Sequence, residues 1–137
     1  MTTSTSNADV VREVSEALGR GDLIAVMGRV SRDVRWAVNV ADREAAPWFG
    51  EYVGKRSLPA FFEALSTVTF SDFTLKAVLS EGDLVITWLH VAFTAPGGGQ
   101  VDTEEVQIWR LQEGKIVSVD TLLDTLAVER AFRGPTG

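Results

Sequence analysis

Four strand-like segments in the second half of the chain constrain its fold more than any other feature. They are joined by short connections, each of which contains glycine: Glu81-Gly82-Asp83, Pro96-Gly97-Gly98-Gly99 and Gln112-Glu113-Gly114. Connections of this length and composition favour hairpins, so successive segments are expected to pair in antiparallel fashion. The predicted strands cover about 69–80, 83–94, 100–112 and 115–123.

The first half of the chain carries helical patterns and one further strand. Apolar residues from Val10 to Leu18 recur at helical spacing, whereas the stretch 34–40 alternates and is rich in β-branched residues. The stretch 41–52 contains turn-forming residues and is expected to be irregular. The predicted elements are a helix over 8–19, a helix from the cap Asp22 to about Val30, a strand over 34–40, a helix from about Ser57 and a closing helix over 125–132.

These elements predict a single α+β domain. Helices that are segregated in sequence from an antiparallel sheet pack against it as a separate layer, and a curved sheet around such a layer leaves a pocket. A chain of 137 residues is long enough to bury one core. We assign residues 8–133 to this domain and the Thr- and Ser-rich residues 1–7 to a disordered tail.

Composition excludes several functional classes. The chain has no cysteine and one histidine, so a metal site is not expected. A phosphate-binding loop is not expected either, because Gly97-Gly98-Gly99 lies between two predicted strands rather than before a helix. A formal charge of −6 without a Lys/Arg cluster argues against nucleic acid. No apolar run is long enough for a bilayer. We expect a cytoplasmic protein that uses neither a metal nor a cofactor and binds no membrane.

Three sequence motifs resemble the SnoaL-like proteins of the nuclear transport factor 2-like superfamily, to which the ketosteroid isomerases are related. They are Pro47-Trp48-Phe49-Gly50-Glu51-Tyr52-Val53-Gly54-Lys55, the run from Gln107 to Ile116, and Asp124 after Leu122-Leu123. The resemblance spans about residues 9–132. It implies a cone-shaped domain in which a strongly curved, mixed or antiparallel sheet wraps around the N-terminal helices.

The same resemblance implies that the best-known catalytic groups are replaced. The isomerases use an Asp base with an oxyanion hole of a Tyr and a protonated Asp, and these fall on Val38, Val14 and Gln107. Valine moves no proton and glutamine donates only an amide hydrogen bond, so isomerisation by that mechanism is not expected. An acidic residue of the cyclases falls on Thr121. Asp120, one residue away, points to the opposite face unless a bulge shifts the register.

Strand alternation, aligned on this resemblance, predicts an apolar pocket with few polar groups. Glu105 is the only carboxylate expected to face inward, and desolvation would raise its pKa towards neutrality; the alternative is a solvated or Arg-paired residue near a hairpin opening. Asp124 either lies at the mouth or caps the closing helix, and Asn39 and Asp42 lie in a loop over the opening. The candidate catalytic residues are Glu105 and Gln107; the candidate substrate-binding residues are Trp36, Val38, Tyr52, Leu89, Val91, Trp109, Thr121 and Asp124.

The opposite face of the predicted sheet is also apolar. The only histidine, His90, lies on it, which argues against a catalytic role. So much apolar surface is unfavourable in water, and a two-fold dimer would cover it. The predicted interface residues are Ile86, Trp88, His90, Val106 and Ile108.

The first functional hypothesis is a cofactor-free, SnoaL-like enzyme that acts on a hydrophobic small molecule by acid–base chemistry, such as a cyclase or isomerase of a polyketide- or terpenoid-like substrate. The second is a carrier that binds an apolar ligand without altering it, which the valines at 14 and 38 favour. A protein-interaction module that uses the outer sheet face is the third.

Overall fold

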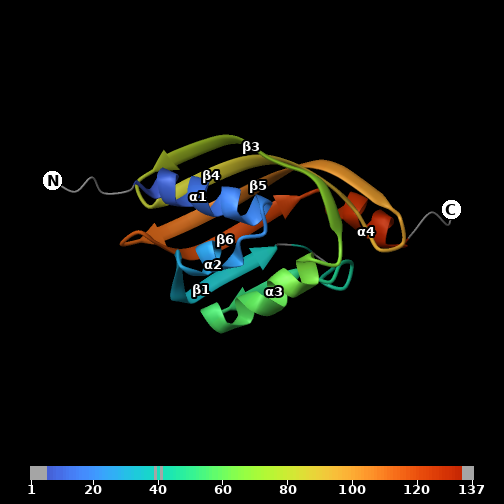
Figure 1. Cartoon of the computed structure of the whole chain (residues 1–137), viewed down its shortest axis with the longest axis horizontal. Helices are drawn as coiled ribbons and strands as arrows, with labels where there is room; N and C mark the ends of the chain where they lie inside the picture. Colours follow the sequence, from blue (N-terminus) through green and yellow to red (C-terminus); the bar gives the residue numbers. More distant parts are fainter. Residues whose placement is uncertain (1–5, 39, 41, 134–137) are drawn as a thin grey trace.

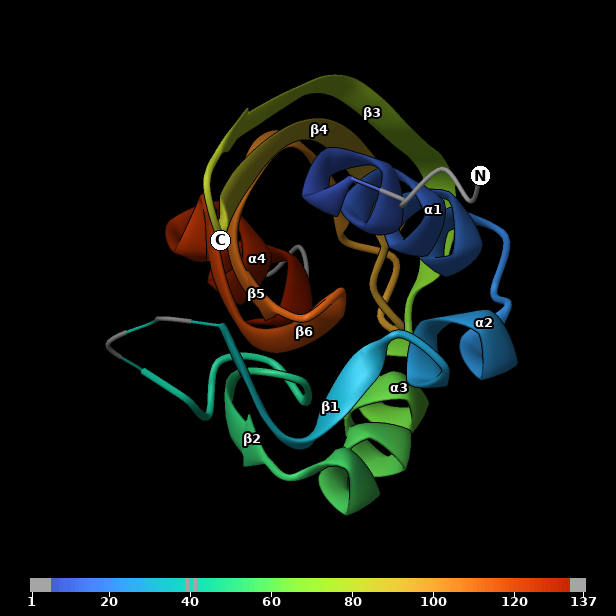
Figure 2. The same ribbon diagram turned by 90° about the vertical axis from the view of Figure 1, so that its left-hand side faces the viewer.

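The computed structural model describes residues 6–38, 40 and 42–133 and shows a strongly curled sheet with helices inside and beside it (Figures 1 and 2). This confirms the α+β cone expected from the sequence. The elements are α1 (Asn7–Gly19), α2 (Leu23–Met27), β1 (Val30–Val38), β2 (Gly50–Val53), the 3₁₀ turn η1 (Lys55–Ser57), α3 (Leu58–Leu65), β3 (Thr69–Glu81), β4 (Leu84–Thr94), β5 (Gln100–Gln112), β6 (Lys115–Leu123) and α4 (Thr125–Arg133).

The six strands form one sheet in the order β2-β1-β6-β5-β4-β3. Strands β3 to β6 pair with their neighbours in antiparallel register, as the glycine-containing connections predicted. Strand β1 joins the other edge of this meander by pairing with β6 in parallel. The sheet is therefore mixed, and its curvature carries β3 and β4 over α1 while β1 and β2 lie near α3 (Figure 2).

Helix α1 begins at Asn7, one residue earlier than the sequence analysis predicted. The side chain of Ser6 accepts a hydrogen bond from the backbone N–H of Asp9 and caps the helix, so Asn7 lies in the first turn. Residues 1–5 of the predicted tail lie outside the described residues. The apolar stripe of α1 is fully buried, with Val10, Val11 and Val14 at most 1% exposed, and it anchors the helix against the concave side of the sheet.

The stretch 41–52 departs from the prediction, because residues 50–53 form β2. This strand has four residues, too few for an alternation pattern to be visible, and its pairing with β1 creates it: Trp36 faces Tyr52 in the register. Gly50 begins this strand and Gly54 follows it, with φ of 125° and 86°, which other residues rarely adopt. The boundaries of α2 and β1 also differ, since α2 ends at Met27 and β1 begins at Val30.

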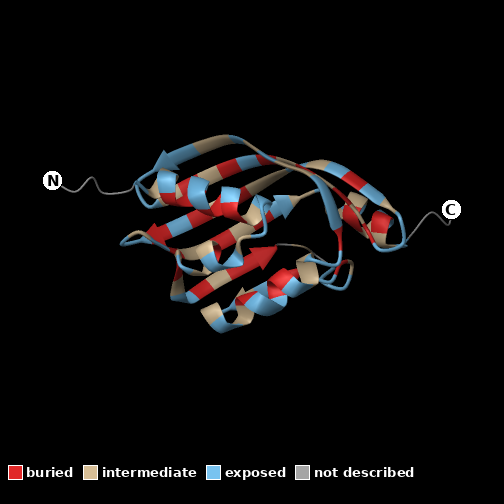
Figure 3. Cartoon of the chain, viewed as in Figure 1, coloured by how far each residue is buried: buried red, intermediate tan, exposed pale blue. Residues whose placement is uncertain are grey.

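Burial alternates along the central strands, as Figure 3 shows. Every second residue of β4 from Val85 to Phe93 is at most 2% exposed, and the predicted inward residues Leu89 and Val91 are among them. Strand β6 breaks the simple alternation. Its register with β5 shifts after Arg110, so that Ile116 is buried, whereas Val117, which shares a face with Val119 in a regular strand, is only half-buried. The alternation is restored at Val119, and the site described below depends on the residues that follow.

Candidate functional site

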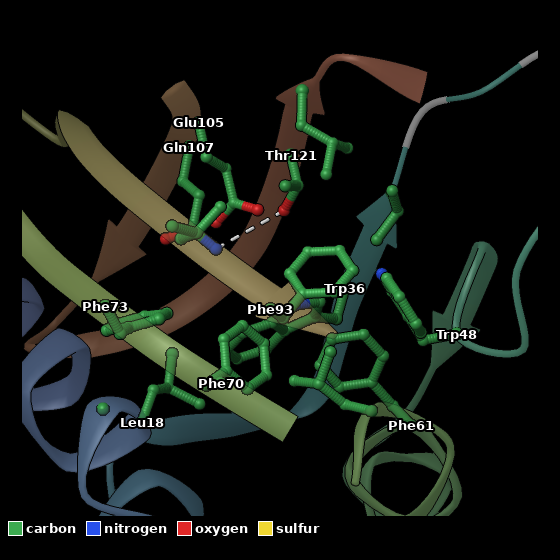
Figure 4. Close-up of a pocket in the computed structure, with 15 residues that line it drawn as sticks. Leu18, Trp36, Trp48, Phe61, Phe70, Phe73, Phe93, Glu105, Gln107 and Thr121 are labelled. Carbon is green, nitrogen blue, oxygen red and sulfur yellow. Dashed lines mark hydrogen bonds between the residues drawn. The ribbon is translucent and has the colours of Figure 1, made fainter. Parts of the chain in front are cut away.

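A cavity of about 100 Å³ lies between the concave face of the sheet and the helices. Figure 4 shows its two sides: Glu105, Gln107 and Thr121 at one end, and a group of aromatic rings across from them. The cavity is lined by Leu18 and Gly19 of α1, Trp36 and Val38 of β1, Trp48 of the loop before β2, Phe61 and Leu65 of α3, Phe70 and Phe73 of β3, Val91 and Phe93 of β4, Glu105 and Gln107 of β5, and Thr121 and Leu123 of β6.

The polar end of the cavity is built by the pairing of β5 with β6. Glu105 faces Leu123 and Gln107 faces Thr121 in the register, so these inward side chains form two adjacent rows. Residues two apart on a strand share a face, which is why Glu105 and Gln107 lie side by side. The sequence analysis predicted this parity, and the structure places both residues in the cavity wall.

Glu105 is the only ionisable side chain among the described residues that line the cavity. Its carboxyl group has no hydrogen-bond or ion-pair partner within the part of the chain that the structure describes. Burial without a compensating charge disfavours the carboxylate and raises the pKa of Glu105 to about 7. The alternative of an Arg-paired Glu105 is therefore wrong. A carboxyl group with this pKa exchanges a proton readily near neutral pH.

Two further polar groups in the wall are buried without a partner among the described residues. Gln107 donates from Nε2 to Thr121 Oγ1 over 3.5 Å, a long contact, and its Oε1 accepts nothing. The indole N–H of Trp36 likewise donates to no described atom. A buried polar group without a partner costs about 1–3 kcal/mol. A ligand or water that supplies an acceptor and a donor at these atoms would recover that cost.

Four residues predicted to bind substrate do not line the cavity. Tyr52 packs edge-on against Phe61, with ring centroids 5.1 Å apart. Leu89 is fully buried in the core. Trp109 lies deeper than the cavity, where its Nε1 donates to Thr87 Oγ1 at 2.9 Å. Asp124 accepts from the backbone N–H of Ala127 at 3.0 Å and caps α4, the alternative that the sequence left open.

The acidic candidates of the loop before β2 and of strand β6 also lie outside the cavity wall. Asp42 is outside the cavity lining, and Asn39 lies outside the described residues. Asp120 also stays off the cavity wall, because it pairs with Ile108 of the opposite face in the register and binds Arg35 Nη1 at 2.9 Å. No bulge brings it inward. The carboxyl group of the site is therefore Glu105.

The aromatic side of the cavity contains residues that sequence reasoning missed. Phe70 and Phe73 are three apart, so simple alternation places them on opposite faces. A register shift between Phe70 and Asp72 in the pairing with β4 changes the parity, and both rings line the cavity. Trp48 belongs to the predicted irregular loop, and its ring packs 5.6 Å from that of Phe93. The resemblance motif that contains Trp48 was the only signal for it.

The outer face of the sheet carries polar contacts as well as apolar residues. Trp88 is 44% exposed, and its Nε1 donates to Glu104 at 2.9 Å while Lys76 Nζ lies 4.5 Å from the ring centroid. His90 Nε2 lies 2.6 Å from Asp102 Oδ1. Ile86, Val106 and Ile108 are partly buried within the same face. None of these residues lines the cavity, which agrees with the parity expected for them.

Within the described part of the chain, no cluster of three or more His, Cys, Asp or Glu side chains is placed to hold a metal ion. None of the described helices has the length and apolar character required to span a bilayer.

The curled sheet and its helix-covered cavity have the nuclear transport factor 2-like fold. Residues 11–119 match the model of the SnoaL-like domain family, and the chain belongs to that family. A comparison with curated proteins gave no significant match.

Solved structures share this fold at low sequence identity. A nuclear transport factor 2-like protein from Burkholderia thailandensis is 24% identical, with 96% of this chain and 100% of its own aligned and a TM-score of 0.84. A putative isomerase from Rhodopseudomonas palustris is 19% identical over 93% and 95% of the chains, with a TM-score of 0.72. TerC, co-crystallised with polyporic acid, is 16% identical over 93% and 98%, with a TM-score of 0.80.

Proposed function

We propose that this protein is a cofactor-free acid–base enzyme that acts on a small hydrophobic molecule, with Glu105 as the group that transfers the proton. The observation that carries the proposal is the unpartnered carboxyl group of Glu105 in a wall whose other described residues carry no charge, with its pKa raised by burial to about 7. A general base or acid works best when its pKa lies near the working pH. Structural carboxylates are usually paired or solvated instead.

The chemistry requires one carboxyl group to act in both directions. The carboxylate of Glu105 removes a proton from a carbon or hydroxyl of the substrate, and the resulting carboxylic acid returns a proton to another atom, so that the enzyme is unchanged after each cycle. Negative charge that develops on a substrate oxygen is stabilised by hydrogen-bond donors held in place. The amide of Gln107 and the indole N–H of Trp36 are the donors available in the wall.

Relatives in structure support a reaction of the isomerase or cyclase type. One structural neighbour carries the description of a putative isomerase, and TerC was crystallised with polyporic acid. We extend this to isomerisation or cyclisation of a polyketide- or terpenoid-like substrate. Trp36, Val38, Val91 and Thr121, which the sequence analysis assigned to substrate binding, line the cavity and orient the ligand in this scheme.

The decisive experiment replaces Glu105 by Gln, which keeps the shape of the side chain and removes its ionisation. Glu104→Gln is the matched control, because Glu104 is the neighbouring residue on β5 and faces the outer side. Turnover of a panel of hydrophobic ketones and polyenes is followed by mass spectrometry. Binding is followed by fluorescence, since Trp36 and Trp48 line the cavity. We expect Glu105→Gln to abolish turnover but bind ligand, and Glu104→Gln to retain both. Unchanged turnover in Glu105→Gln would remove Glu105 from the mechanism.

A carrier function is the second candidate, favoured by Val38 in the cavity wall and Val14 in the core. The isomerases that the sequence resembles have proton-transferring or hydrogen-bonding groups at these positions. A carrier would retain a small molecule through purification, which native mass spectrometry detects. A bound ligand that is released unchanged, together with no Glu105-dependent turnover in the panel, would favour this function.

We also propose a homodimer formed through the outer sheet face around Ile86, Trp88, His90, Val106 and Ile108. The exposed ring of Trp88 supports it, as does Leu122, which is 46% exposed on the same face. Large aromatic side chains are enriched in interfaces, where few of them carry most of the binding energy. Such a dimer leaves the cavity of each subunit on the opposite side of its sheet.

A further inference from the structure

We infer that the ligand presents to the cavity one six-membered ring that carries both a carbonyl and a hydroxyl group, as a hydroxycyclohexanone does. The inference rests on the proposed function for the role of Glu105, and it goes further by specifying the size and the polar pattern of the ligand. Three features of the described residues carry it: the volume of the cavity, the bracing of its aromatic wall, and the polar atoms that lack partners.

The volume sets the size of the enclosed group. A dry cavity of about 150 Å³ lined by apolar side chains holds one benzene ring, and the present cavity has about 100 Å³. It therefore holds about one ring, and the remaining rings of a larger fused system would lie outside the cavity unless the wall moved. This limit narrows the polyketide- or terpenoid-like ligand proposed above to the single ring that enters the cavity.

The aromatic wall resists such movement because its rings contact one another. The centroid of Trp36 lies 5.6 Å from that of Phe61 and 5.6 Å from that of Trp109 behind it. On the other side, Phe93 lies 5.4 Å from Phe70 and 5.6 Å from Trp48. Each ring is thus held by at least one other ring. Widening the cavity displaces several close-packed groups together.

The polar atoms set the hydrogen-bonding pattern. Trp36 Nε1 is a donor without a partner and Gln107 Oε1 is an acceptor without a partner among the described residues. A carbonyl oxygen satisfies the first and a hydroxyl hydrogen the second. Glu105 then faces a ring whose carbon-bound hydrogens next to the carbonyl are the most acidic.

Other ligand classes fit less well. Among the described residues that line the cavity there is no Lys or Arg, so a phosphate or carboxylate ligand would add a second, uncompensated anion. An ammonium group suits the aromatic rings and Glu105. It supplies donors only, however, and leaves the indole N–H of Trp36 without an acceptor.

The test compares one-ring probes that differ in a single group. Calorimetry measures binding of 2- and 4-hydroxycyclohexanone, cyclohexanone, cyclohexanol, cyclohexylamine and the three-ring 2-hydroxy-9-fluorenone to the wild-type protein. We expect at least one hydroxycyclohexanone isomer to bind at least tenfold more tightly than any of the other four. Tighter binding of the fluorenone would contradict the size limit, since its larger apolar surface favours it in the absence of that limit. Tighter binding of cyclohexylamine would contradict the polar pattern and identify an amine site.

Two variants test the assigned atoms. Gln107→Met removes the acceptor while keeping a side chain of similar length, and it should reduce the preference for hydroxycyclohexanone over cyclohexanone at least fivefold. Trp36→Phe removes the indole N–H and should reduce the preference for hydroxycyclohexanone over cyclohexanol. Circular dichroism confirms that each variant is folded. If both folded variants keep the preference for hydroxycyclohexanone over cyclohexanone and cyclohexanol, groups other than Gln107 and Trp36 recognise the ligand.

Proton exchange separates this inference from the proposed function. Deuterium incorporation next to the carbonyl of 4-hydroxycyclohexanone in D₂O reports catalysis by Glu105, whereas calorimetry reports the ligand class. Selective binding with exchange that is equally fast in Glu105→Gln would overturn the proposed function and leave the ligand class standing. Glu105-dependent exchange in cyclohexanone, without selective binding of the hydroxy ketones, would do the reverse.

Discussion

Replacing Glu105 by Gln should stabilise the folded protein at alkaline pH. In the unfolded chain the carboxyl group has its ordinary pKa of 4.5, and burial in the folded protein raises that pKa to about 7. The folded state therefore holds more protons than the unfolded state between these two values, and stability falls as the pH rises through this window. The contribution of Glu105 to the free energy of unfolding is fully present below about pH 4.5 and is lost above about pH 7.

The size of the effect follows from the same two pKa values. At about 1.4 kcal/mol per pKa unit, the difference between 4.5 and about 7 corresponds to about 3 kcal/mol. Glutamine cannot ionise, so the variant does not lose this amount. The free energy of unfolding of Glu105→Gln, relative to the wild-type protein, should rise by about 3 kcal/mol between pH 4.5 and pH 8.5. Urea unfolding monitored by tryptophan fluorescence across this range measures it.

Glu104→Gln is again the control, and its effect should have the opposite sign. Desolvation raises the pKa of Glu104, but hydrogen bonds from Trp88 and Lys76 outweigh it and lower that pKa. A carboxyl group whose pKa is lowered by folding stabilises the folded protein at pH values above its ordinary pKa, and this stabilisation is lost in acid. Glu104→Gln should therefore gain no stability over the wild-type protein at pH 8.5. A pH-independent difference between Glu105→Gln and the wild-type protein would refute the assignment of a desolvated, uncompensated carboxyl group to Glu105.

Two further predictions concern packing and assembly. A Cβ at Gly99 would clash with the carbonyl oxygen of Ala131 in α4, so Gly99→Ala should lower the free energy of unfolding by about 1–3 kcal/mol. Gly97→Ala should be neutral, because a Cβ there would meet no atom within 4 Å. Equal melting temperatures for the two variants would argue against this contact. The wild-type protein should sediment as a dimer at micromolar concentration, and Trp88→Ala should sediment as a monomer. Ile24→Ala is the control, since Ile24 of α2 is 88% exposed and its replacement should leave the oligomeric state unchanged. A monomeric wild-type protein would exclude the outer-face dimer.

The long elements of the fold were predictable because their patterns are local. The stripe of α1, the alternation of β4 and the glycine turns of the meander each arise within about a dozen residues. Strand β2 was missed because its structure arises from pairing with β1, which no pattern within four residues reveals. The parallel contact of β1 with β6 joins segments about 80 residues apart. Such contacts belong to the tertiary structure and leave no periodic signal.

The same distinction between local pattern and tertiary packing explains which residues of the candidate site could be predicted. Parity placed Glu105 and Gln107 correctly because β5 runs opposite β4 without a register shift along its whole length. Parity gives the wrong answer on β3, for which the sequence analysis named no inward residue, because register shifts bring Phe70 and Phe73 to the same side. It also did not show which inward residues line the cavity: Leu89 and Trp109 are fully buried on the predicted face but do not line it. Alternation gives the face of a strand, whereas cavity contact depends on how the helices fill the concave side.

The environment of Glu105 links the stability of this domain to its proposed chemistry. A second carboxylate nearby would couple to Glu105 and divide the titration between two groups. Asp120 is held on the other face by Arg35, and Val38 carries no charge, so desolvation alone raises the pKa of Glu105. The burial that lowers the free energy of unfolding at high pH by about 3 kcal/mol also holds the pKa of Glu105 near neutral pH. There the group serves as both acid and base. A polar ligand that partners Glu105 would offset part of that cost. The site is therefore least stable when empty and ionised, which is the state that gains most from binding substrate.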